Sequence, residues 1–203
     1  LKQTYQEWSQ QTYLLMMASP RYGKSQQFLE KVSKIDPFSP ASEELLADLA
    51  QEYTELLHTF RHELGLSVIQ PGRFILPGNL AGAPILEFFP FPGIEELDAN
   101  AYQNADDSSF IGMLRARFLE YKDQVVRKFY KEHFIRFDRQ IVLADCLTPL
   151  NKGKQNFTDL SLAMSMILKS YNYGKSSFFS RLFAPKIDKL LFAASKADHV
   201  TPD

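Results

Sequence analysis

The stretch KLLFAASKAD, residues 189–198, decides how the fold is interpreted. Its first seven residues are largely apolar without alternation, which is typical of a strand buried on both faces of a parallel sheet. The run QIVLADC at residues 140–146 has the same character. Between the two we expect a helix that Thr158 could cap, with apolar residues at helical spacing. Strand, helix and strand then form one βαβ unit with parallel strands.

Two strands do not make a stable open sheet, because both outer edges would be bare. We therefore expect the remaining strands to come from sequence outside this chain, which also lacks a starting Met. The predicted fold class is α/β, with part of a parallel sheet in residues 136–203 and a mainly helical region in residues 1–135.

The helical region shows two clear helices. The first is expected to begin at Ser39 as its N-cap, with Pro40 at the first helical position, and to end at Gly65. The second should occupy roughly residues 109–134. Its expected buried stripe consists of Phe110, Leu114, Phe118, Tyr121, Val125 and Phe129.

The segment between these helices is dense in Gly and Pro from residue 70 to residue 84. Such a composition predicts an irregular loop, with room for one short strand at Phe74 to Leu76.

Charge and composition exclude several classes of protein. The chain of 203 residues has 23 Lys+Arg against 24 Asp+Glu, so a net charge of −1 provides no global field for nucleic acid. No apolar run approaches the ~20 residues of a membrane span, so we expect no transmembrane segment and no secretory signal. Cys146 is the single cysteine, which favours a reducing, cytoplasmic compartment.

The residues after the second strand carry a chemical signal. Ser195-Lys196-Ala197-Asp198 follows the pattern Asn/Thr-Lys-x-Asp, the guanine-reading element of GTP-binding proteins. The carboxylate of Asp198 can accept from both guanine N1–H and the exocyclic amino group, whereas adenine would leave it unpaired. The stem of Lys196 can lie on the base, and Ser195 can brace the loop. The residues alone leave a second interpretation equally open, a solvated strand-to-helix turn.

Three segments together resemble the YcjX-like family of P-loop nucleotide-binding proteins, which are bacterial and stress-associated. They are residues 69–84, 134–143 and 187–200. The resemblance implies a Ras-like GTP-binding fold, with GTP or GDP and Mg²⁺ as cofactors, and makes residues 1 to about 135 most of a large helical insertion. Family members carry a phosphate loop upstream that is absent here. The family usually has Thr at the position of Ser195.

Weaker signals have less specific explanations beside them. Asp145 ends the first strand and could contact Mg²⁺, or it could cap the turn that follows. Arg73 could act as an arginine finger toward a γ-phosphate, or pair with a carboxylate. His58 and His62 could share a metal ion, but no third ligand lies near in the sequence, so an exposed helical pair is favoured.

Two triplets, Gly23-Lys24-Ser25 and Gly174-Lys175-Ser176, copy the tail of a phosphate loop. Neither has the earlier Gly that the full signature needs, so both are interpreted as turns.

Two functions remain from the sequence. In the first, the chain is the central part of a GTPase that recognises guanine through Lys196 and Asp198 and presents its helical region to a protein effector. In the second, it is a helical interaction module on a nucleotide-binding relic that no longer hydrolyses.

Overall fold

The computed structural model describes residues 3–132, 139–170 and 189–195, which form two compact units. The helical unit comprises Leu1–Leu64 and Ile69–Val126. The α/β unit comprises Gly65–Val68 and Arg127–Asp203. Each unit is described by itself below.

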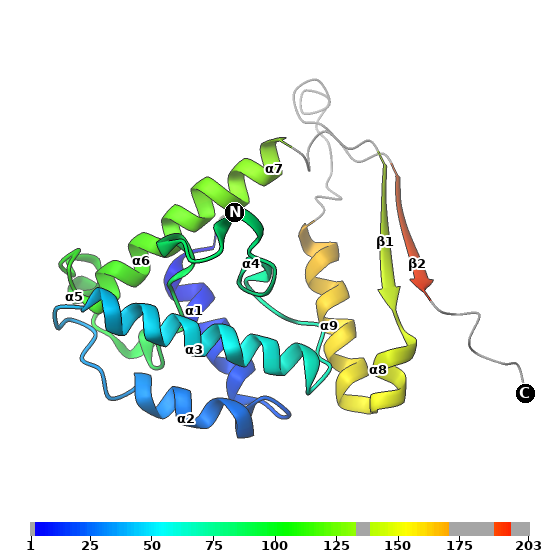
Figure 1. The fold of residues 1–203 in the computed structure, drawn as a ribbon, viewed down its shortest axis with the longest axis horizontal. Coiled ribbons are helices and arrows are strands. Elements are labelled where there is room, and N and C mark those ends of the chain that lie inside the picture. The colour runs from blue at the N-terminus through cyan, green and yellow to red at the C-terminus, as the bar shows by residue number, and fades with distance from the viewer. Residues whose placement is uncertain (1–2, 133–138, 171–188, 196–203) are drawn as a thin grey trace, which may run out of the picture. The chain divides into compact units, whose positions relative to one another are not determined.

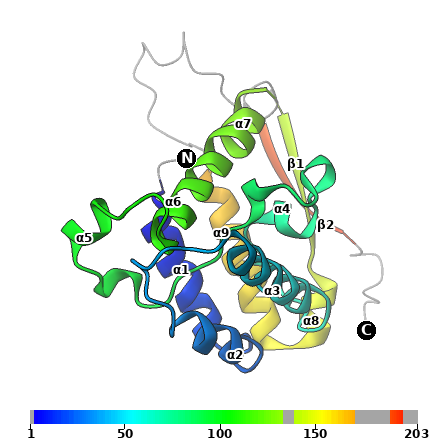
Figure 2. The same ribbon diagram turned by 60° about the vertical axis from the view of Figure 1, so that its left-hand side comes forward.

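The described part of the helical unit contains six α-helices, three short 3₁₀ turns and most of a π-helical segment that follows the last of these helices. The helices are α1 (Tyr5–Met17), α2 (Tyr22–Val32), α3 (Glu43–His62), α4 (Gly72–Ile75), α5 (Ala99–Gln103) and α6 (Phe110–Glu120). The 3₁₀ turns are Gly78–Leu80, Pro84–Leu86 and Ile94–Glu96. Within this unit α1 lies beside α2 and α6, and α2 lies beside α3 (Figures 1 and 2).

The core of the helical unit is aromatic. Trp8 of α1 meets the ring of Phe88 with centroids 5.2 Å apart, and Phe88 meets Phe74 at 4.9 Å. Helix α1 also provides a hydrogen bond to the segment after the second 3₁₀ turn, because Tyr5 Oη donates to the Phe89 carbonyl at 2.9 Å. The edge-to-face contacts of Phe88 with Trp8 and Phe74 stabilise the core beyond the free energy that comes from the buried area of the rings.

Helix α3 begins later than its sequence pattern suggests. Its N-cap is Ser42, whose Oγ accepts from Leu45 N, so the assignment of Ser39 as N-cap was wrong. Ser39 Oγ instead donates to the Asp36 carbonyl, and Pro40 forms an isolated bridge with Ser109. The helix ends at His62, and Gly65, with φ +67°, lies three residues beyond it.

The Gly/Pro-rich loop contains a helix where a short strand was expected. Residues Gly72–Ile75 form α4, which buries Phe74 and Ile75 and leaves Leu76 exposed. A strand would alternate its side chains, whereas one helical turn directs two successive apolar side chains inward.

Helix α6 confirms the predicted start, because Ser109 Oγ accepts from Gly112 N. The first part of the predicted stripe, up to Tyr121, is buried. A π-helical segment, Tyr121–Arg127, then precedes α7 (Lys128–Glu132), in which Phe129 is 49 % exposed. The prediction that Phe129 is buried was wrong, since a π segment has more residues per turn and rotates the stripe.

The α/β unit contains the predicted parallel strands. β1 (Arg139–Asp145) pairs in parallel with β2 (Lys189–Ser195), in a register that runs from Arg139 opposite Lys189 to Asp145 opposite Ser195. Two helices, α8 (Leu147–Lys152) and α9 (Lys154–Ser170), follow β1. Figure 1 shows α9 running alongside this two-stranded sheet.

Helix α9 begins before the predicted cap. Thr158 lies inside the helix, where its Oγ1 donates to the Lys154 carbonyl, so it does not cap the helix. The preceding Gly153 has φ +106°, a conformation that favours glycine and separates α9 from α8.

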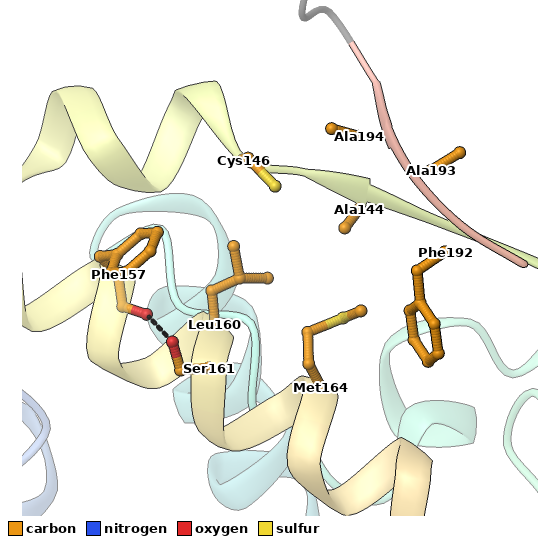
Figure 3. Close-up of a pocket in the computed structure, with 9 residues that line it drawn as sticks. All are labelled: Ala144, Cys146, Phe157, Leu160, Ser161, Met164, Phe192, Ala193 and Ala194. Atoms are coloured by element: carbon orange, nitrogen blue, oxygen red, sulfur yellow. Dashed lines mark hydrogen bonds between the residues drawn. The ribbon is translucent and has the colours of Figure 1, made fainter.

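The two faces of the described sheet differ in burial. Ala144 is buried, and Figure 3 shows Ala144 and Phe192 directed toward α9. Ile141, Leu143 and Leu191 are more than half exposed. Ala144 is the only buried strand residue among those described, and Phe192 is 37 % exposed, so the expectation of strands buried on both faces was wrong for the two described strands, which have α9 against one face only (Figure 1). In this part of the chain, no helix is long and apolar enough to cross a membrane.

Candidate nucleotide-binding site

The carboxyl ends of β1 and β2 lie together at one edge of the sheet. Asp145 and Ser195 are paired as the last residues of their strands. Ser195 Oγ donates to the Ala144 carbonyl at 3.3 Å. This bond ties the end of β2 to β1 immediately before Lys196. Ligands of parallel α/β sheets bind beyond this kind of edge.

Lys196, Ala197 and Asp198 lie outside the described residues. Their candidate roles in binding the base therefore stay predictions. What the structure supplies is the position of the residue directly before them.

Asp145 caps the turn that opens α8. One carboxylate oxygen accepts from Thr148 N at 3.1 Å and the other from Thr148 Oγ1 at 2.8 Å. Of the two roles considered for Asp145, capping of the turn is therefore the one that the structure shows. No group of three His, Cys, Asp or Glu side chains suited to a metal ion occurs among the described residues.

An apolar cavity of about 460 Å³ lies between the sheet and α9. Figure 3 shows Ala144 and Phe192 on one side of it, with Leu160 and Met164 on the other. Of its polar lining groups, Ser161 Oγ donates to the Phe157 carbonyl of its own helix. The described lining has no charged side chain, so this cavity does not suit the phosphates of a nucleotide.

Arg73, the candidate arginine finger, lies in α4 of the helical unit. Burial raises the pKa of Tyr121 to about 12, and the positive charge of Arg73 partly offsets that rise. Arg73 is thus close to Tyr121, and its role toward a phosphate stays a prediction.

The histidine pair and one of the two Gly-Lys-Ser triplets lie among the described residues. The rings of His58 and His62 stack at 5.8 Å on α3. Gly23-Lys24-Ser25 lies within α2, so its interpretation as a turn was wrong, and Lys24 Nζ pairs with Glu63 at 2.8 Å. Gly174-Lys175-Ser176 lies outside the described residues.

Two polar side chains of α9 were missed by the sequence analysis. Asn156 and Asp159 are 7 % and 6 % exposed. Their spacing of three residues places both on one helix face, but polar residues recur along the whole of α9, so the sequence carried no signal that set these two apart.

Comparison with known proteins identifies the family. A sequence profile of the YcjX-like family, DUF463, matches residues 1–203. The chain is 50 % identical over 203 residues to "Ras-like GTPase YcjX" of Escherichia coli (strain K12), covering 100 % of this chain and 43 % of that protein. It is 43 % identical over 206 residues to the protein of the same name from Shewanella oneidensis (strain MR-1), covering 100 % of this chain and 42 % of that protein. It thus spans less than half the length of these curated relatives. The chain belongs to the YcjX-like family.

Proposed function

We propose that this chain is the central part of a GTP-binding protein that hydrolyses GTP, in which Lys196 and Asp198 recognise guanine. The observation that carries the proposal is the in-register parallel pair β1–β2, whose second strand ends at Ser195 directly before these residues. The name Ras-like GTPase, borne by both relatives, supports the same function.

The chemistry of the proposed site is selective for the base. Asp198 would accept two hydrogen bonds from the guanine edge, each worth about 1.5–3 kcal/mol because the acceptor is charged. Adenine offers no matching pair of donors, so the carboxylate would lose its hydration without compensation. The bond from Ser195 Oγ to Ala144 would fix the start of this loop against β1.

The phosphates would be held outside the described residues. We propose a P-loop, Ras-like sheet in which residues 1 to about 135 are a helical insertion that faces a protein effector. The described residues do not fit a Mg²⁺ site by themselves, since they contain no group of three side chains suited to a metal ion and the carboxylate of Asp145 is engaged by Thr148. A reducing, cytoplasmic setting fits the single Cys146.

Isothermal titration of the full-length protein with GDP, GTP, ADP and ATP tests the proposal. Two charge-assisted bonds predict that GDP binds at least about 100-fold more tightly than ADP. Equal affinity for GDP and ADP would refute guanine recognition. Guanine-selective binding without phosphate release would refute hydrolysis and favour a nucleotide-binding relic that serves as an interaction module.

A further inference from the structure

Two side chains of helix α9 form hydrogen bonds with the backbone of a short segment that is distant in sequence. One carboxylate oxygen of Asp159 accepts from Ser67 N at 2.6 Å and from Val68 N at 2.8 Å. Asn156 Nδ2, on the same helix face, donates to the Gly65 carbonyl at 3.1 Å. We call Asn156 and Asp159 the clamp, and Gly65–Val68 the clamped segment.

The contact between the clamp and the clamped segment is buried and is not an incidental contact at the surface. Both of its side chains are more than nine-tenths buried, and Leu66 and Val68 of the clamped segment are buried as well. Burying a carboxylate costs free energy unless its oxygens accept hydrogen bonds. The two backbone N–H groups that donate to one oxygen of Asp159 offset this cost. Gly65 enters the segment with φ +67°, a conformation that other residues adopt at a cost.

The clamped segment has an unusual place in the chain. It clusters with the α/β unit, although the residues on both of its sides belong to the helical unit. In sequence it joins α3 to α4, whereas the clamp lies on the helix that follows β1 and precedes β2. Any displacement of α9 that keeps these hydrogen bonds must also displace the chain between α3 and α4.

We infer that Asn156 and Asp159 are positioning residues through which α9 transmits the nucleotide state to the α3–α4 connection. This inference rests on the proposed function, because it needs a nucleotide at the sheet edge. A switch protein requires an element whose contacts differ between states, and a helix beside the nucleotide edge that holds a distant segment is such an element.

Hydrogen exchange in the full-length protein tests whether the clamp holds the segment. In Asp159→Ala, the amides of Ser67 and Val68 should exchange at least about tenfold faster than in the unmodified protein. Thr158→Ala is the matched control, because Thr158 is the exposed neighbour of Asp159 and its Oγ1 donates to the Lys154 carbonyl within α9. Unchanged exchange in Asp159→Ala would overturn the inference.

A second variant keeps the test valid if Asp159→Ala fails to fold. Asn156→Leu retains the approximate size of the side chain and adds no charge but removes the donor to the Gly65 carbonyl, so it should loosen the segment while leaving Asp159 in place.

Transmission is tested by comparing exchange with GDP and with a non-hydrolysable GTP analogue. We expect residues 69–80 to exchange differently in the two states, and the clamp variants to lose this difference while their GDP affinity stays within about twofold. A difference that persists in the variants would overturn transmission. Absence of nucleotide binding would refute the proposed function and transmission together, whereas the first experiment would still report whether the clamp holds the segment.

Discussion

Substitution of a buried arginine in the helical unit is expected to lower the free energy of unfolding. Arg117 of α6 is 8 % exposed, and its guanidinium donates to Glu87 Oε2 at 2.8 Å and to the Glu87 carbonyl at 3.2 Å. It also pairs with Glu43 of α3. We predict that Arg117→Met destabilises the helical unit, because it leaves Glu87 without its cation.

The magnitude follows from the exposure of the two acids. Removing one partner of a fully buried pair costs about 3–5 kcal/mol. The side chain of Glu43 is 72 % exposed and can be hydrated, whereas that of Glu87 is 24 % exposed and cannot be hydrated fully. We therefore expect the lower end, a loss of about 3 kcal/mol in the free energy of unfolding.

Urea unfolding followed by circular dichroism measures this loss as a lower midpoint at an unchanged slope. Arg61→Met is the control, because Arg61 is exposed in the last turn of α3 and should change stability by less than about 0.5 kcal/mol. Adding Glu87→Gln to Arg117→Met should recover part of the loss, since the carboxylate that then lacks its cation is only that of Glu43, which is exposed to water. A loss below about 1 kcal/mol in Arg117→Met would refute the argument from burial.

Two further predictions concern the same unit. Gly112→Ala should destabilise it by about 1–3 kcal/mol in urea unfolding, because a Cβ there would overlap the Asp106 carbonyl oxygen, a backbone atom. Gly23→Ala, whose Cβ would meet nothing within 4 Å, should be neutral or stabilising, and equal effects of the two substitutions would contradict this explanation. Burial raises the pKa of Tyr121 to about 12, so its neutral form contributes stability that is complete below pH ~10 and is lost as the pH rises through about 12. Between about pH 10 and pH 12 the free energy of unfolding should fall by roughly 2 kcal/mol more in the unmodified protein than in Tyr121→Phe, and parallel curves would show that Tyr121 is not the group responsible.

The sequence predicted the elements whose pattern is local. The apolar runs of β1 and β2 identified both strands, and their connection through a helix predicted the parallel pairing. The start of α6 near residue 109 was predictable because a regular apolar stripe begins there.

Contacts between distant residues decided what the sequence did not show. Ser39 and Ser42 are both plausible caps, and the bridge between Pro40 and Ser109 keeps the first of them out of the helix. Phe74 lies in α4, where its ring packs on that of Phe88, which is fourteen positions further along the chain. A single sequence carries no local signal for such pairings.

The pairing of the two strand ends, beyond which we propose the nucleotide site, was predictable from the sequence, but the clamp was not. Asp159 resembles an ordinary solvated residue of an amphipathic helix. Its partners, Ser67 and Val68, lie about ninety residues earlier in the chain, and only the folded structure brings them together.

Base selectivity of Asp198→Asn in the full-length protein tests the central claim most directly. An amide at this position can donate to the C2 oxygen of xanthine but no longer accepts both guanine donors. We predict that GDP affinity falls by at least about 100-fold and that xanthosine diphosphate becomes the tighter ligand in isothermal titration. If the variant binds GDP within about twofold of the unmodified protein, Asp198 does not recognise the base and the account is contradicted.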